Sequence, residues 1–408
     1  MFTKLPTRMK NVILPVALLT LLTTVSCQKT TRSGDSDKDT TEITMSADSI
    51  PMSDTTAIAY KLPDPAAFDG TVNGKKTGLY ILKGTNIQVA ITNYGARVVG
   101  LLVPDKAGKL TDVVMGFGSL KAYQVANEPF YGPIVGRFGN RIARGKFTLD
   151  GKAYNTVQNN NGNTLHGGPT GFHTQVWDAK QVDDKTLQLT YLSKDGEGGF
   201  PGNVTTTVTY SVDGESGLKI NYKATTDKET PYNPTSHGFF NLNGEGSGTV
   251  NNHVLMIDAD RYSAVDKGLI PQGEPVSVEG TPFDFRKPTV IGARVDQKNE
   301  QLTFGGGYDH NWVLNHKMGT LDKAVEITGD KSGINMTVLT TEPAMQFYGG
   351  NFFKGNDQGK YGLATKFRGG FALEAQHYPD SPNHPTYPTT ILKPGQTYAQ
   401  TTVYRFGK

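Results

Sequence analysis

The strongest structural signal in the chain is a pair of neighbouring segments in which every second residue is apolar, aromatic or β-branched. In the first segment these residues are Val204, Thr206, Val208, Tyr210 and Val212. A turn containing two glycines follows at 213–217, and the second segment then alternates with Leu218, Ile220, Tyr222 and Ala224. Residues two apart share one face of a strand, so the pattern predicts a β-hairpin with one apolar face.

The same two-residue period occurs at 187–191 and at 336–340. No segment shows a helical period over three turns or more, and 48 Gly and 22 Pro favour short strands joined by turns. We find no internal repeat at a fixed spacing. A length of 408 residues allows one large or two ordinary domains. The chain is therefore predicted to be an all-β protein, a sandwich or a barrel.

Residues 1–27 are similar to a bacterial lipoprotein signal peptide. Lys4, Arg8 and Lys10 precede an apolar run at 12–22, which is too short to span a membrane as a helix. The run leads to a small residue and then Cys27, the only cysteine in the chain, although Thr24 stands where such signals usually have Leu. We expect Cys27 to be lipidated and the protein to be anchored in the cell envelope, periplasmic or associated with the outer membrane. A secretory signal with an incidental cysteine is the alternative.

Residues 28–66 are rich in Ser, Thr, Asp and Lys, and almost no apolar residue precedes Ile50. Such a composition cannot bury a core, so we expect a disordered tether that leads to a folded domain at 67–408. The net charge is +3, which gives no electrostatic case for binding nucleic acid. A single cysteine excludes an intramolecular disulfide and a thiolate metal site.

Polar residues gather in five places between the predicted strands or at their ends, each flanked by glycine or aromatic residues. These places are residues 136–144, 163–168, 234–242, 305–312 and 345–351. The candidate functional residues within them are Asn140, Arg141, His166, His237, Asp309 and Gln346. Each of them taken alone also fits a solvated loop or a structural role, whereas together they form a set suited to a polar ligand.

Glu374 follows an apolar run near the end of the chain, at 371–374, and precedes a turn at 379–382. Its position alone favours a solvated place on the outer face of a strand, because an isolated buried charge is costly. The alternative is a carboxylate held inward for a function.

Aromatic side chains beside Asn, Gln, Arg and Asp suit a sugar, since rings cover its C–H patches and polar groups pair with its hydroxyls. Interconversion of the two anomers of a free sugar needs one base at the anomeric hydroxyl and one acid at the ring oxygen. A Glu and a His can fill these roles, since an imidazole of ordinary pKa gives and takes protons at neutral pH. The reaction requires no metal, nucleophile or redox cofactor.

Six motifs, in this order along the chain, resemble those of the aldose 1-epimerase (galactose mutarotase) family. They are Gly-Arg-x-x-Asn-Arg (136–141), Leu-His-Gly-Gly (165–168), Ser-His-Gly-Phe-Phe-Asn-Leu (236–242), Gly-Tyr-Asp-His-Asn (307–311), Gln-Phe-Tyr-x-Gly-Asn (346–351) and Leu-Glu-x-Gln-His-Tyr-Pro-Asp-Ser-Pro-Asn (373–383). The resemblance covers residues 67–408 and implies a β-supersandwich fold. It also implies an isomerase of hexose metabolism that acts on a free aldose such as D-galactose or D-glucose, without a cofactor. We expect a monomer.

The resemblance also implies roles for individual residues. Glu374 is similar to the family's general base and His237 to its general acid. Arg141, His166 and Asp309 resemble its hydroxyl-binding residues, and Asn140 and Gln346 are expected to line the same site. Phe239 stands where the family's motif usually has Tyr, so it would contact substrate without a hydroxyl, which bears on affinity or sugar preference.

Other functions remain open at this point. A glycoside hydrolase would pair Glu374 with Asp309 as two carboxylates. A sugar-binding lipoprotein would keep the fold without catalysis. A sugar-phosphate epimerase would need a cationic cluster, for which Arg137 or Arg144 is available.

A metal site is also conceivable, from His166 with His173 or from His377 with His384, although neither pair has a usual ligand spacing. His173, His253 and His316 lie outside the motifs and are predicted to be surface or structural residues.

Overall fold

The computed structural model describes residues 58–408. The predicted leader with Cys27, and the tether up to residue 57, lie outside the described residues. Within 58–408, no helix is long and apolar enough to cross a membrane. Residues before the expected boundary at Ala67 already contact the rest of the described chain: Tyr60 donates a hydrogen bond to the Glu245 carbonyl (3.2 Å), and its ring packs on Tyr361.

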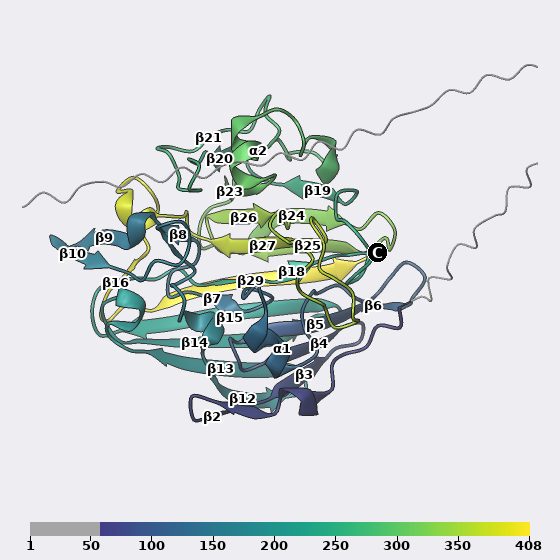
Figure 1. Cartoon of the computed structure of the whole chain (residues 1–408). Coiled ribbons are helices and arrows are strands. Elements are labelled where there is room, and N and C mark those ends of the chain that lie inside the picture. The colour runs from purple at the N-terminus through teal and green to yellow at the C-terminus, as the bar shows by residue number, and fades with distance from the viewer. Residues whose placement is uncertain (1–57) are drawn as a thin grey trace, which may run out of the picture. The chain divides into compact units, whose positions relative to one another are not determined.

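Three antiparallel sheets contain most of the strand residues in the described part of the chain (Figure 1). The nine-stranded sheet has the order β12 (Asp178–Asp183), β13 (Thr186–Ser193), β14 (Val204–Asp213), β15 (Gly217–Thr226), β29 (Tyr398–Gly407), β25 (Asn335–Thr340), β24 (Asp322–Thr328), β19 (Val254–Ile257) and β22 (Thr289–Val290). The six-stranded sheet has the order β18 (Phe239–Phe240), β27 (Phe371–Gln376), β26 (Ala344–Tyr348), β23 (Asp309–Val313), β20 (Arg261–Ser263) and β21 (Val276–Ser277). The four-stranded sheet contains β3 (Leu79–Lys83), β4 (Gln88–Thr92), β5 (Arg97–Pro104) and β6 (Leu110–Asp112).

Short elements connect these sheets. Five two-stranded pairs are β1 (Gly70–Val72) with β2 (Lys75–Thr77), β7 (Ile134–Val135) with β17 (Thr235–Ser236), β8 (Arg141–Ile142) with β11 (Thr164–Leu165), β9 (Lys146–Leu149) with β10 (Lys152–Asn155), and β16 (Thr230–Pro231) with β28 (Ile391–Leu392). The described α-helices are α1 (Leu120–Val125) and α2 (Glu300–Gly305), each six residues long. The prediction of an all-β protein without long helices is therefore confirmed for this part of the chain.

The predicted hairpin is present as β14 and β15, which pair from Val204 opposite Thr226 to Asp213 opposite Gly217. Most residues of the predicted apolar face are buried, including Val208, Tyr210 and Ile220. The two-residue period was enough to predict this hairpin, because successive side chains of a strand point to opposite faces of the sheet.

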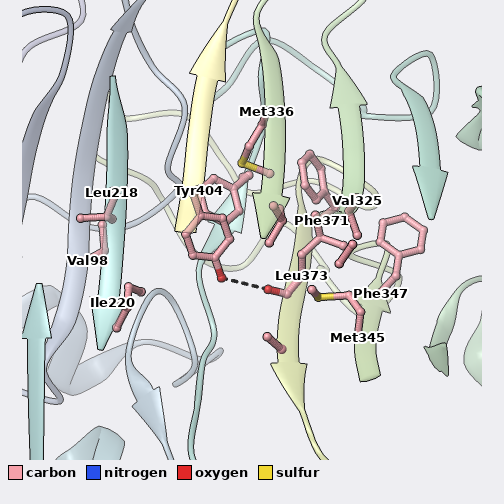
Figure 2. Packing of buried hydrophobic residues seen from close by; sticks show 14 of the residues in the cluster. Val98, Leu218, Ile220, Val325, Met336, Met345, Phe347, Phe371, Leu373 and Tyr404 are labelled. Carbon is pink, nitrogen blue, oxygen red and sulfur yellow. Dashed lines mark hydrogen bonds between the residues drawn. The ribbon is translucent and has the colours of Figure 1, made fainter. Parts of the chain in front are cut away.

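The hydrophobic core lies between the sheets (Figure 2). Phe347 of β26 and Leu373 of β27 contribute to it from the six-stranded sheet, and Met336 of β25 and Tyr404 of β29 from the nine-stranded sheet. The Tyr404 hydroxyl donates a hydrogen bond to the Leu373 carbonyl (3.1 Å), so the two sheets are also joined by a directional contact.

The strand that carries Glu374 is buried on both faces. Phe371 and Leu373 point into the core, and Ala372 and Glu374 point to the opposite face, as the alternation predicted. The solvated position favoured for Glu374 is wrong, because the side chain is only 2% exposed. Loops cover the outer face of this strand, and their position cannot be read from the strand's own sequence.

A buried ionic cluster fixes the segment that follows β26. The ammonium of Lys360 lies 2.5 Å from a Glu245 carboxylate oxygen and 3.4 Å from one of Asp112. It also donates to the Val114 carbonyl (2.6 Å), and Tyr361 donates to Asp112 (2.9 Å). All three ionic side chains are almost fully buried, so each depends on the others for its charge.

Candidate active site

Three adjacent strands of the six-stranded sheet carry polar side chains on the face opposite the core. Glu374 of β27 lies directly across from Gln346 of β26, and Asp309 of β23 lies across from Tyr348. Cross-strand partners share a face of the sheet, and so do residues two apart, so these four side chains form one polar patch. One side of these strands thus packs into the main core, and the other carries the polar patch beside a second hydrophobic cluster that includes Tyr348 and Ala372.

His237 reaches this patch from the short segment between β17 and β18. Its backbone N–H donates to the Pro133 carbonyl (2.8 Å), and its carbonyl accepts from Gly132 (3.0 Å). These contacts bring the His237 Nε2 to 3.5 Å from Glu374 Oε1, with both side chains buried. The structure therefore places the predicted acid and the predicted base side by side.

Arg141 and His166 come from the β8–β11 pair, in which Arg141 lies opposite Leu165. The backbone N–H of Asn140 donates to His166 Nδ1 (3.1 Å). Because Nδ1 is the acceptor, a neutral His166 carries its proton on Nε2. His166 can therefore donate a hydrogen bond from Nε2.

Asp309 is supported by two predicted site residues. Gln346 Nε2 donates to Asp309 Oδ1 (2.7 Å), and an Arg141 guanidinium nitrogen lies 3.8 Å from Oδ2. Gln346 is not among the residues that line the cavity, contrary to the prediction; its side-chain nitrogen holds Asp309 from behind the lining. Arg141 is also held by Asn160, whose side-chain oxygen accepts from Nε (3.3 Å).

Replacement of Gln346 by Met should raise KM for the sugar roughly tenfold with a smaller effect on kcat, because a hydrogen bond to a charged group contributes ~1.5–3 kcal/mol. Loss of this donor frees Asp309 to leave its binding position, whereas His237 and Glu374 stay in place. Initial rates of anomer exchange over a range of sugar concentrations measure both constants. An unchanged KM would show that Arg141 alone positions Asp309.

These side chains open into a cavity of about 590 Å³. Of the eight predicted site residues in the described part, seven line it: Asn140, Arg141, His166, His237, Phe239, Asp309 and Glu374. Aromatic rings form much of the wall, from Phe130, Phe239, Tyr348 and Phe352. Phe239 is fully buried, with its ring centroid 4.9 Å from that of His237. Apolar walls with a few convergent polar groups are typical of a site for a small polyol.

Several residues of the wall were not predicted. His173 was expected to be a surface or structural residue, but it is buried and lines the cavity, with Phe130 packed between it and His166. Glu128, Phe130 and Phe352 were also missed. None of them stands in a recognisable motif, and they reach the site only because loops fold over it.

Comparison with known proteins identifies the family. A family model described as aldose 1-epimerase matches residues 79–405. The chain belongs to the aldose 1-epimerase family. It is 41% identical over 327 residues to galactose mutarotase from Bos taurus, which covers 80% of this chain and 92% of that protein. It is 36% identical over 330 residues to aldose 1-epimerase from Escherichia coli K12, covering 80% and 94%.

Solved structures agree with this placement in the aldose 1-epimerase family. An aldose epimerase homologue from C. elegans matches with a TM-score of 0.75 at 29% identity, covering 81% of this chain and 99% of that one. Galactose 1-epimerase from Lactobacillus acidophilus matches with a TM-score of 0.71 at 27% identity, covering 83% and 96%. The galactose mutarotase-like sandwich expected from the motifs is therefore confirmed.

Burial sets the protonation of this epimerase-family site. It lowers the pKa of His237 to about 4 and that of His173 to about 3, and it holds the pKa of His166 well below its ordinary value. Burial, reinforced by the charge of Asp309, raises the pKa of Glu374 well above its ordinary value. The expectation of an ordinary imidazole pKa is wrong for His237, because burial disfavours the charged ring.

A sugar-phosphate epimerase would need a cationic cluster at the cavity, and neither candidate arginine lines it. Arg137 lies outside the cavity lining, and its guanidinium donates to the carbonyls of Ser193, Pro201 and Gly202. Arg144 does not line the cavity either, so the cationic cluster of a sugar-phosphate enzyme does not form among the described residues.

The histidines considered for a metal include three whose rings already have a hydrogen-bond or carboxylate partner, namely His166, His377 and His384. One ring nitrogen each of His166 and His237 and a Glu374 oxygen lie within 4.8 Å of one another. The proton that Asn140 fixes on His166 Nε2 opposes ligation through that atom, since a metal needs a free nitrogen lone pair. His377 is bound to Glu342 (2.6 Å) and His384 lies near Asp380 (3.3 Å), so these two imidazoles serve different carboxylates.

Proposed function

We propose that the protein interconverts the α and β anomers of free aldohexoses, such as D-galactose and D-glucose. The observation that carries this proposal is the contact between His237 and Glu374 inside an aromatic-walled cavity. The names of its relatives, galactose mutarotase and aldose 1-epimerase, support the same reaction. A glycoside hydrolase is less well supported, because Asp309, its second carboxylate, is held by Gln346 and Arg141.

The reaction moves one proton at each end of the bond that breaks. Glu374, as the carboxylate, takes the proton from the anomeric hydroxyl, and His237, as the imidazolium, protonates the ring oxygen as the C1–O5 bond opens. The open-chain aldehyde turns about C1–C2. Ring closure reverses both transfers: Glu374 returns its proton to O1, and His237 takes the proton from the O5 hydroxyl. The pair needs one proton in total throughout.

The resting site holds that proton on Glu374, since burial favours the neutral form of both groups. The mechanism has the same arrangement, a protonated Glu374 and a neutral His237, when the sugar is in its open-chain form. A ring-closed sugar must therefore shift the proton toward His237 before the bond opens. Asp309, Arg141 and His166 are positioned to bind sugar hydroxyls while this occurs.

The rate should depend on pH as a bell-shaped curve, because only the singly protonated pair is active. On the acid side kcat/KM should fall as pH drops through the pKa of His237, about 4, where both groups carry protons. On the alkaline side it should fall as Glu374 loses its proton at a pH well above its ordinary pKa. Polarimetric rates from pH 3.5 to 10 measure both limbs. An acid limb near pH 6.5 would show that His237 is solvated.

Polarimetry on freshly dissolved α-D-galactose and α-D-glucose tests the proposed function. We expect the purified protein to accelerate the approach to anomeric equilibrium for at least one of the two sugars. Binding of either sugar without acceleration would instead indicate a non-catalytic sugar-binding protein. Release of reducing sugar from an aryl glycoside would indicate a hydrolase.

We further propose that the protein acts as a monomer anchored in the cell envelope by a lipid on Cys27. The apolar run at 12–22 and the small residue before Cys27 support the anchor. Mass spectrometry of the mature protein from its native host should find an acylated N-terminal cysteine. Light scattering of the folded domain without its leader, in buffer without detergent, should give the mass of one chain. A soluble mature protein with unmodified Cys27 would contradict the anchor.

A further inference from the structure

A carboxylate that the proposed mechanism does not use lies in the wall of the sugar cavity. Glu128 lines both this cavity and a neighbouring one of about 420 Å³. Its Oε1 accepts a hydrogen bond from the Phe130 N–H (3.0 Å), and its own backbone N–H donates to Asp357 (3.0 Å). Glu128 is therefore fixed at the place where the two cavities meet.

The charged groups around Glu128 come from several elements. Arg97 lies beneath its segment and donates to the carbonyls of Pro129 (3.2 Å) and Tyr131 (2.8 Å). The remaining charged groups that share one of the two cavities with Glu128 are Asp357, Lys354, Glu374, Asp309 and Arg141. Burial raises the pKa of Glu128 to about 7, with a further increase from Asp357 and an opposing effect of Arg97.

The sugar cavity offers little to neutralise an anion. Arg141 is the only Lys or Arg among the described residues that line it, and this guanidinium is already engaged by Asp309 and Asn160. The three histidines of the wall are neutral at pH 7, since burial keeps the pKa of each low. A negative substituent on the sugar would thus meet Glu128 and Asp309 without a free cation.

We propose that Glu128 is a specificity-determining residue whose carboxylate disfavours aldoses with an anionic group, such as hexuronic acids, relative to neutral aldohexoses. This inference rests on the proposed function and names the substrate class of the same site. Like charges brought together across an interface repel, so a carboxylate in the cavity wall disfavours an anionic ligand relative to a neutral one.

The test compares D-galacturonate with D-galactose as substrates of wild-type protein and of Glu128→Gln, which keeps the acceptor for Phe130. A sugar carboxyl is ionised throughout pH 6–8, because ordinary carboxyl pKa values lie near about 3.5, so only the protein changes its charge. Dividing by kcat/KM for galactose removes the pH dependence that both sugars share through His237 and Glu374. Glu279→Gln is the matched control, since Glu279 is an exposed carboxylate outside both cavities.

In wild-type protein, the ratio of kcat/KM for galacturonate to that for galactose should fall roughly tenfold from pH 6 to pH 8, equivalent to ~1.4 kcal/mol. In Glu128→Gln the ratio should stay level and exceed the wild-type value at pH 8 roughly tenfold. Glu279→Gln should behave as wild type. If galacturonate is not turned over, its inhibition constant against galactose gives the same comparison.

A wild-type ratio that does not fall, or an equal fall in Glu128→Gln, would overturn the role of Glu128. Failure of the proposed function gives a different result, namely no acceleration of galactose by wild-type protein. In that case the dissociation constants of the two sugars, measured at pH 6 and pH 8, still test the discrimination by Glu128.

Discussion

Replacement of Glu374 by Gln should lower kcat for galactose by ~10²–10⁴-fold while sugar binding is retained, since general acid–base catalysis typically contributes this much. The amide keeps the size of the side chain but can neither take the anomeric proton nor return it. Glu374 is almost fully buried and lies 3.5 Å from His237, so it is the carboxylate placed to exchange a proton together with this imidazole. Polarimetry gives the rate, and calorimetric titration with galactose gives the affinity.

The control for this variant is Glu279→Gln, which removes one negative charge from an exposed position. It should leave the rate unchanged. If Glu374→Gln kept more than about a tenth of the wild-type rate, the role of general base would have to pass to another group, since even the lower bound for acid–base catalysis is ~10²-fold.

Replacement of Lys360 by Met should destabilise the protein by ~3–5 kcal/mol at neutral pH, because two buried carboxylates lose their shared cation. Asp112 and Glu245 have almost no exposed side-chain surface through which water could solvate them. Denaturant unfolding followed by tryptophan fluorescence measures the change. Lys366→Met, at an exposed lysine six residues further on, should have little effect.

The loss of stability in Lys360→Met should shrink as the pH falls. Burial raises the folded-state pKa of Glu245 above its ordinary value and Lys360 opposes this effect, so loss of the cation should raise the pKa of Glu245 further. A group with a raised folded-state pKa favours the folded state below its unfolded-state pKa and opposes it as pH rises through the folded-state value. The difference from wild type should therefore be larger at pH 8 than at pH 5. An equal difference at both values would indicate lost packing rather than unpaired charge.

The parts of the fold that the sequence predicted are those set by local alternation. The β14–β15 hairpin needed only the period of two residues between 204 and 224. The burial of Glu374 could not be predicted in this way, because the loops that cover the outer face of β27 come from distant parts of the chain. The same reason explains why Gln346 was placed in the lining although it lies behind Asp309.

The residues proposed to bind and convert the sugar were predicted better than the rest of the cavity wall. His237, Asp309 and Glu374 stand in motifs, and each is fixed by a strand or by the segment next to one. Glu128, Phe130 and His173 reach the cavity from loops, and their contribution depends on contacts such as those of Asp357 with residues 127 and 128. The low pKa of His237 follows from burial, which no single segment encodes.

The division of the six-stranded sheet into an apolar and a polar face has an evolutionary consequence. Glu374 is flanked in the chain by Leu373 and Ala375, which belong to the core, so its position is inherited from the packing that keeps the protein folded. The place of Glu374 in the site cannot drift without a loss of core packing, whereas the opposite wall is built from loops. A lineage can therefore acquire a new sugar preference by altering loops while the position of Glu374 is kept by the packing of β27.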